Sequence, residues 1–265
     1  MTALVEYGRL LQRFAIEAEA LAGAIDNSRL EDEVPGCPGL TVREAARHVG
    51  SDSRMVLHWL REGRRPRDWQ RDPTSSQSLA DYVRTGTTPL MRELAEHEAE
   101  DPCPGWYEPE QNYGFWLRRM THEVTVHRID IQGAYRGEDG DEPSPVPDDI
   151  AVDGIDEILH VWFAYRLTTL QVYGTTARNC TVRSGGWSWL TVTGPGGIGN
   201  EVYRLWSTPG RKGWREGDER SGEAYADPNL MYLWLWGRRN VTEVSVHGDD
   251  DATGQLWVLL RLATR

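Results

Sequence analysis

One stretch near the middle of the chain reads Arg119-Met120-Thr121-His122-Glu123-Val124-Thr125-Val126-His127-Arg128-Ile129-Asp130. If the stretch is helical, Glu123 and His127 lie about 40° apart on one face. A carboxylate and an imidazole placed in this way can bind one divalent metal ion. His122 lies about 140° round the helix from His127, so this pair does not form the zinc-protease motif, which needs two histidines four residues apart. The stretch therefore predicts two metal ligands and requires a third from elsewhere.

The same stretch lies inside a longer amphipathic pattern that predicts a helix from Tyr113 to Tyr135. Its apolar stripe, which includes His127, consists of Trp116, Leu117, Met120, Val124, His127 and Ile131. Glu123 and His127 are therefore expected to point inward. Buried carboxylates are rare unless they are paired or bound to a metal. A buried ion pair between the two side chains is the alternative to a metal site.

Three earlier segments also have helical periodicity, and they predict a four-helix bundle together with 113–135. They cover residues 3–25, 42–61 and about 77–97, and each has apolar residues at intervals of three and four. Gly86 and Pro89 predict a kink or a split in the third segment. Bundles of this kind build metal sites in their core from side chains on facing helices.

A histidine on another helix of the bundle is the natural third ligand. His48 is the best candidate, because it lies at the edge of the apolar face of its predicted helix. His58 is on a different side of that helix, and His97 lies in a glutamate-rich segment. His160 and His247 fall outside the bundle. Taken alone, His48 also fits an ordinary hydrogen-bonded histidine, so its assignment depends on Glu123 and His127.

The pattern changes after the bundle, which predicts a second domain. Residues 138–147 are polar and proline-rich and are expected to link a domain at 1–137 to one at 148–265. The sequence of this second domain predicts a long helix over 148–173 and three strands over 180–182, 187–192 and 201–206. A second helix over 226–236, a strand over 241–247 and a closing helix over 252–262 are expected to follow. The expected fold class is therefore α+β with two domains.

Composition restricts the class of protein. The 265 residues include 39% hydrophobic and 26% charged residues, as in ordinary globular proteins. The net charge of −12 argues against a general nucleic-acid binder, which needs a basic surface. No apolar run is long enough for a membrane span, and the N-terminus lacks a signal-peptide pattern, so a cytoplasmic location is expected.

The cysteines and the basic residues bear on the kinds of site and on the source of the sequence. Cys37, Cys103 and Cys180 have no CxxC spacing, so neither a disulfide framework nor a cysteine zinc site is predicted. Lys212 is the only lysine, and this preference for arginine is typical of GC-rich coding sequences such as those of actinobacteria. A basic, proline-containing loop is predicted at residues 64–68.

Two motifs resemble the mycothiol-dependent maleylpyruvate isomerase family. The first is Pro35-Gly36-Cys37-Pro38-Gly39-Leu40-Thr41-Val42-Arg43-Glu44-Ala45-Ala46-Arg47-His48-Val49-Gly50, and the second is His122 to Asp130. A weaker resemblance covers residues 153–157 and 233–239. The resemblance implies a DinB-like N-terminal bundle, in which His48, Glu123 and His127 hold a zinc ion. It also implies a C-terminal domain similar to sterol carrier proteins.

The resemblance further implies a catalytic arginine in the C-terminal domain. Arg238 is the expected counterpart and Arg239 the second choice, because they follow the Leu-Trp-Gly run. An arginine that interacts with the dipole of a helix C-terminus is the alternative explanation. Asp130, close after His127, is expected either to orient that ligand or to serve at the helix end.

These features predict a metal-dependent enzyme that uses mycothiol. Three protein ligands leave a metal position open, and a thiol bound there is deprotonated. The thiolate would attack a small electrophile, and an arginine would hold a carboxylate of the substrate. Addition, rotation and elimination would give a cis–trans isomerase, whereas a retained thioether would give an S-transferase. Two alternatives are a non-catalytic DinB-like protein that binds a metal or a small molecule, and a metal-dependent hydrolase. Zinc, nickel and iron all accept this ligand set, and the sequence leaves the substrate and oligomeric state open.

Overall fold

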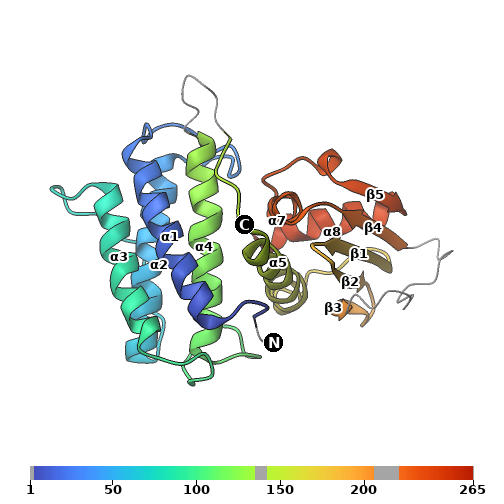
Figure 1. The fold of residues 1–265 in the computed structure, drawn as a ribbon. Coiled ribbons are helices and arrows are strands. Elements are labelled where there is room, and N and C mark those ends of the chain that lie inside the picture. Colours follow the sequence, from blue (N-terminus) through green and yellow to red (C-terminus); the bar gives the residue numbers. More distant parts are fainter. Residues whose placement is uncertain (1–2, 135–141, 206–220, 265) are drawn as a thin grey trace. The chain divides into compact units, whose positions relative to one another are not determined.

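The computed structural model describes residues 3–134, 142–205 and 221–264. The chain divides into two compact units, Met1–Pro145 and Val146–Arg265. The first unit is helical and the second combines helices with a sheet (Figure 1), which confirms the predicted two-domain α+β fold class. The division falls within the expected linker 138–147, of which residues 138–141 lie outside the described residues.

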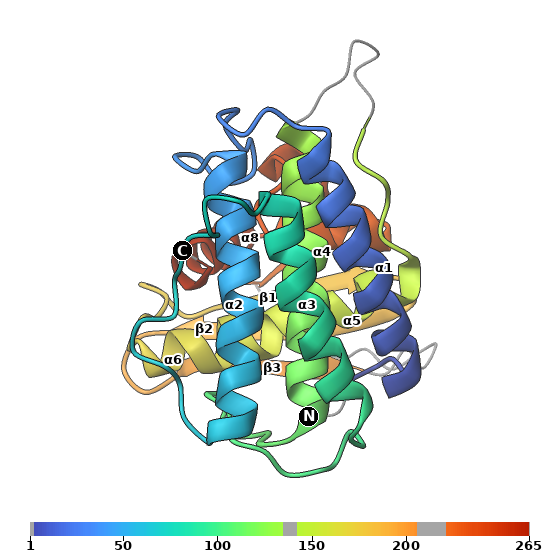
Figure 2. The same cartoon turned by 90° about the vertical axis from the view of Figure 1, so that its left-hand side faces the viewer.

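The first unit consists of four long helices that run alongside one another (Figures 1 and 2). They are α1 (Tyr7–Asp26), α2 (Val42–Glu62), α3 (Leu79–Ala95) and α4 (Tyr113–Ala134). Each helix places an apolar stripe in a common core, where Phe14, Leu21, Val49, Leu90 and Leu117 are fully buried. The four predicted helices are therefore present, although α1 begins four residues later than expected.

Local signals fix the limits of α2 and α3. The Thr41 side chain accepts a hydrogen bond from the Glu44 backbone N–H, and the Glu44 carboxylate accepts one from the Thr41 backbone N–H, so a capping box starts α2. Gly63 ends that helix with φ of 70°, a left-handed conformation that favours glycine. The Ser78 hydroxyl caps α3 by accepting a hydrogen bond from Asp81 N at 3.0 Å.

The expected split of the third helix is wrong, because α3 is one helix that includes Pro89. Burial of Leu90 and Leu94 stabilises the helix and offsets the loss of the backbone hydrogen bond that proline cannot donate. Gly86 serves close packing instead of ending the helix. A Cβ atom at Gly86 would lie 2.8 Å from the Gly50 carbonyl oxygen of α2, so α2 and α3 approach each other here too closely for a side chain.

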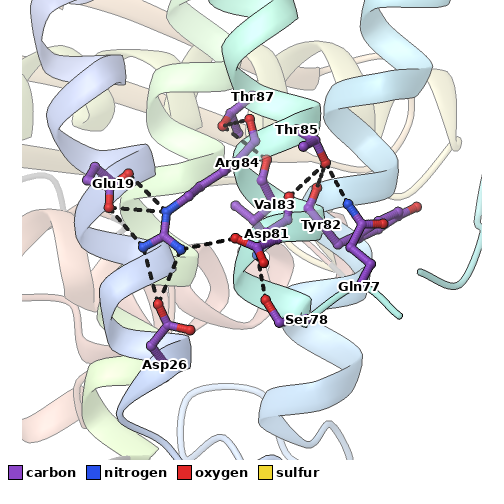
Figure 3. A network of polar contacts seen from close by, with 10 residues as sticks. All are labelled: Glu19, Asp26, Gln77, Ser78, Asp81, Tyr82, Val83, Arg84, Thr85 and Thr87. Carbon is purple, nitrogen blue, oxygen red and sulfur yellow. Dashed lines mark hydrogen bonds and ion pairs between the residues drawn. The ribbon is translucent and has the colours of Figure 1, made fainter. Parts of the chain in front are cut away.

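An exposed ionic network joins α1 to α3 (Figure 3). The Arg84 guanidinium lies 2.9 Å from Glu19 and 3.2 Å from Asp26 on α1, and 3.6 Å from Asp81 on its own helix. Ion pairs on a hydrated surface contribute little, because solvent screens them and side-chain entropy opposes them.

Arg84→Ala is therefore expected to lower the free energy of unfolding by only about 0.5–1 kcal/mol. Urea denaturation followed by circular dichroism would measure the change. A loss above about 3 kcal/mol, the range of broken buried pairs, would contradict this assignment to the hydrated surface.

The second unit starts with one continuous helical segment and continues into a sheet. The helical segment comprises α5 (Asp148–Glu157), a π-helix η1 (Ile158–Arg166) and α6 (Leu167–Thr169). The strands are β1 (Arg178–Ser184), β2 (Trp187–Gly194), β3 (Gly199–Leu205), β4 (Ser221–Tyr225) and β5 (Ser245–Gly248). Their order is β3-β2-β1-β4-β5; β1 and β4 are parallel, and the other neighbours are antiparallel.

Two further helices and a short turn complete this unit. They are α7 (Pro228–Leu235), the 3-10 turn η2 (Val241–Glu243) and α8 (Asp250–Ala263). Helix α8 packs against β1 and β4, while η1 packs against β3. Trp189, Phe163 and Trp234 are fully buried in the resulting core.

Several predicted limits in the second unit differ from the structure. Strand β4 was not expected, because it is short and contains Gly222. The strand predicted over 241–247 is wrong for its first three residues, which form η2 because Asn240 and Glu243 make a capping box. The helix predicted over 148–173 ends at Thr169. The last residue of the strand predicted over 201–206 lies outside the described residues.

No helix in the described ranges has the length and apolar character needed to cross a membrane.

Candidate metal centre

The structure brings the three predicted ligands together inside the helical unit. His48 comes from α2, and Glu123 and His127 come from adjacent turns of α4. The Oε1 atom of Glu123 lies 3.0 Å from His48 Nε2 and 3.2 Å from His127 Nε2. The three candidate ligand atoms all lie within 4.8 Å of one another. This is the arrangement that a divalent cation requires, and the assignment of the three residues as ligands stays a prediction.

The donor set and its spacing fit zinc or a similar ion. Two ligands of a tetrahedral zinc ion lie roughly 3.3–3.5 Å apart, given metal–ligand bonds of about 2.0–2.2 Å. The observed separations of 3.0 and 3.2 Å need only a small outward movement of the side chains. Three protein ligands would leave one coordination position for water or a substrate.

Solvent reaches the cluster past His48. The His48 side chain is 33% exposed, compared with 16% for Glu123 and 11% for His127. A small molecule would therefore approach from the α2 side, while the α4 ligands line the buried side. This asymmetry gives solvent access to the cluster at His48, while Glu123 and His127 stay largely buried.

Two buried side chains hold the candidate ligands of α4 in place. Arg119, one turn before Glu123, donates a hydrogen bond of 3.0 Å to Glu123 Oε2, which leaves Oε1 directed at the histidines. The Asp130 carboxylate lies 3.3 Å from His127 Nδ1, so Nε2 is the nitrogen that faces the cluster. Cys37, from the loop before α2, donates its thiol hydrogen to Asp130 Oδ2 at 3.6 Å. Such outer contacts fix the orientation of metal ligands.

The protonation states of the cluster are strongly perturbed. Burial opposes ionisation of Glu123, but its hydrogen bonds with His127 and His48 hold its pKa well below the usual range. Burial would lower the pKa of His127, but the carboxylates of Asp130 and Glu123 raise it to about 9. Burial and the charge of Glu123 raise the pKa of Asp52, one turn after His48, to about 6.

These values predict a pH-dependent metal affinity. His127 must lose its proton to bind a cation, and its raised pKa of about 9 makes protons effective competitors below that pH. The apparent zinc affinity is expected to fall about tenfold for each pH unit below 9, from this proton alone. Competition titrations with a chelator between pH 6 and 8 would measure the slope, and a flat profile would contradict it.

Asp130→Asn is expected to weaken zinc binding by about 10–100-fold, because the neutral amide orients His127 less well than the carboxylate does. A chelator titration of the purified variant would measure the affinity. Asp101→Asn is the matched control, since Asp101 accompanies His97, at 3.2 Å, away from the three ligands. Equal zinc affinities of the Asp130 variant and the wild type would show that Asp130 does not orient His127.

The other residues considered from the sequence are not part of the cluster. His122 is fully buried but lies outside it, as the helical geometry predicts. His97 stacks on Tyr113 with 3.8 Å between the ring centroids. His58 is exposed on α2. His160 and His247 belong to the second unit.

Arg238 lies in the second unit, just after α7. Its backbone N–H donates to Leu233 O at 2.8 Å, and Gly237, with φ of 73°, donates to Trp234 O. These two bonds form a Schellman motif that ends α7. The Arg238 side chain donates to Trp236 O at 2.6 Å, and Arg239 lies 3.8 Å from Glu243. These contacts support a helix-end role, and a catalytic role for Arg238 stays a prediction.

Sequence reasoning missed three residues beside the cluster. Arg119 and Asp52 lie one helical turn from Glu123 and His48, so the same periodicity that paired the ligands could have identified them. Trp69 contacts His48 from a loop, with 5.7 Å between ring centroids, and no periodic signal marks it.

Comparisons with known proteins agree with this architecture. Residues 11–132 match the family model described as the mycothiol maleylpyruvate isomerase N-terminal domain. A solved structure, described as the crystal structure of the mycothiol-dependent maleylpyruvate isomerase, is similar with a TM-score of 0.52. The alignment covers 93% of this chain and 95% of that chain at 12% identity, a level at which the likeness concerns the fold. No match was found among curated proteins.

Proposed function

We propose that this protein is a metal-dependent enzyme that activates mycothiol, because residues 11–132 match the model of the mycothiol maleylpyruvate isomerase N-terminal domain. The observation that carries the proposal is the convergence of His48, Glu123 and His127, with their ligand atoms within 4.8 Å of one another. The relatives named in the comparisons act on maleylpyruvate, and a small electrophile of that kind is the proposed substrate class.

Each residue of the site has a separate role in the proposed function. His48, Glu123 and His127 would hold the ion, which we propose is zinc. The bound ion would lower the pKa of a coordinated thiol, so that the thiolate predominates at neutral pH. Arg119 keeps Glu123 Oε2 occupied, so that one carboxylate oxygen faces the ion. Asp130 keeps His127 Nε2 directed at the same point.

A thiolate at this position can add to a carbon–carbon double bond conjugated to a carbonyl group. Addition converts the double bond into a single bond, rotation about it exchanges cis for trans, and elimination returns the thiol. If the adduct instead gains a proton and leaves, the product is a thioether. The same site therefore serves an isomerase or an S-transferase, and the fate of the thiol distinguishes them.

The test combines zinc-loaded protein with mycothiol and maleylpyruvate. An isomerase converts many equivalents of substrate while the thiol concentration stays constant. A transferase consumes one thiol for each substrate molecule, and mass spectrometry detects the adduct. Zinc binding without either reaction would contradict the catalytic proposal and favour a metal-binding or small-molecule-binding protein. Turnover of an ester without thiol would favour a hydrolase. The proposed location is the cytoplasm, as predicted from the sequence.

A further inference from the structure

The loop between α2 and α3 carries positive charge that the protein does not neutralise. Arg64, Arg65 and Arg67 are exposed, and none has an ion-pair partner among the described residues. Other arginines of the helical bundle have carboxylate partners, including Arg13, Arg43, Arg47, Arg61, Arg84, Arg119 and Arg128. In a chain of net charge −12, three uncompensated arginines in four residues form a local site of opposite sign.

The far end of this loop is fixed to the helices. Arg71 N donates to the Ser51 hydroxyl at 3.1 Å, and Arg71 O accepts from Ser51 at 3.0 Å and from the Tyr82 hydroxyl at 2.9 Å. Ser51 of α2 is fully buried and Tyr82 of α3 nearly so. The loop therefore has a defined attachment beside the start of α3, which positions the residues just before Arg71.

Trp69 lies beside the exposed member of the ligand cluster. Its ring meets the His48 ring edge-on, with 5.7 Å between centroids and 73° between planes. His48 is the side past which solvent reaches the cluster, so Trp69 borders that approach. The Arg65 guanidinium carbon lies 5.4 Å from the centroid of the Trp69 ring, within the range of a cation–π contact.

We propose that Trp69 and Arg65 form a recognition element for a planar, unsaturated anion that binds beside the metal centre. The indole supplies a flat apolar face for a conjugated group. The guanidinium supplies paired donors for a carboxylate, and stacking on Trp69 holds it in place. The inference rests on the proposed function, since it names the charge and shape of the molecule that the ligand cluster would receive.

Calorimetric titration with two matched probes tests the element. Maleate is a planar dianion, and maleamide has the same cis double bond with neutral amides. The wild type is expected to bind maleate at least about tenfold more tightly than maleamide. Arg65→Ala should remove most of that preference, and Arg65→Lys should keep part of it because the charge remains. Trp69→Ala should weaken the binding of both probes, and Trp69→Phe should restore part of that binding because it again supplies a flat face.

Controls separate recognition from other effects. Arg92→Ala removes one exposed positive charge from α3 and should leave both affinities within about twofold of wild type. The proposed recognition element would be contradicted by unchanged maleate affinity in Arg65→Ala or Trp69→Ala. It would also be contradicted by a wild type that binds maleate and maleamide equally tightly. The zinc content of each variant is measured in parallel. A wild type that takes up no zinc would refute the proposed function, while the comparison of maleate with maleamide still decides the role of Arg65.

Discussion

His48→Ala is expected to abolish stoichiometric zinc binding and, with it, thiol-dependent turnover. The remaining pair, Glu123 and His127, supplies two ligands from one helix, and zinc sites in proteins need three or four. An affinity loss of about 100-fold or more is expected, because a ligand is lost outright whereas loss of an outer contact already costs 10–100-fold. Inductively coupled plasma mass spectrometry of the purified variant would measure its zinc content.

His58→Ala is the matched control for this substitution. His58 lies on the same helix, ten residues later, and is exposed, so its removal should leave zinc content and turnover at the wild-type level. A His48→Ala variant that kept one zinc per chain, or that kept its thiol-dependent activity, would show that this histidine is not a ligand. Circular dichroism of both variants would verify that α2 is still folded.

Glu17→Ala is expected to lower the free energy of unfolding of the bundle by about 3–5 kcal/mol, the largest single effect outside the ligand cluster. Glu17 of α1 and Arg128 of α4 are almost completely buried, and Arg128 Nε donates to Glu17 Oε2 at 2.6 Å. Arg13 also donates to Glu17. Truncating the carboxylate leaves the Arg128 charge buried without its main partner, and that desolvation accounts for the size of the loss.

Two variants show whether burial causes the loss. Glu17→Gln keeps a hydrogen-bond acceptor and should be less destabilising than Glu17→Ala. Glu19→Ala removes an exposed carboxylate of the same helix, which pairs with Arg84, and should cost at most about 1 kcal/mol. Urea denaturation would measure all three. Similar losses for Glu17→Ala and Glu19→Ala would contradict the account of a buried ion pair. Because Arg128 directly follows the candidate ligand His127, zinc content should be recorded as well.

The sequence predicted the part of the site that depends on one helix. Helical periodicity places Glu123 and His127 on the same face, and it excludes His122, in agreement with the structure. His48 is a different case, because it is 75 residues earlier and reaches Glu123 only through the packing of α2 on α4. The family resemblance, together with the edge of an apolar face, selected it among seven histidines.

The missed features depend on contacts that no local pattern encodes. The position of Trp69 follows from hydrogen bonds that hold Arg71 to Ser51 and Tyr82, three residues from different parts of the unit. Strand β4 owes its place to pairing with β1 and β5, since Gly222 weakens any strand signal in its own sequence. Gly86 was interpreted as a helix breaker, whereas it permits the close approach of α2 and α3. In each case a distant contact outweighs the local preference.

The central claim is that a thiol binds as a thiolate to a metal ion held by His48, Glu123 and His127. Cobalt substitution followed by addition of mycothiol tests it most directly, because cobalt(II) accepts the same ligands and its absorption reports on them. The account predicts one cobalt per chain and a new near-ultraviolet thiolate-to-cobalt band when mycothiol is added, with both absent in His48→Ala. Failure to bind cobalt, or a cobalt spectrum that mycothiol leaves unchanged, would contradict it.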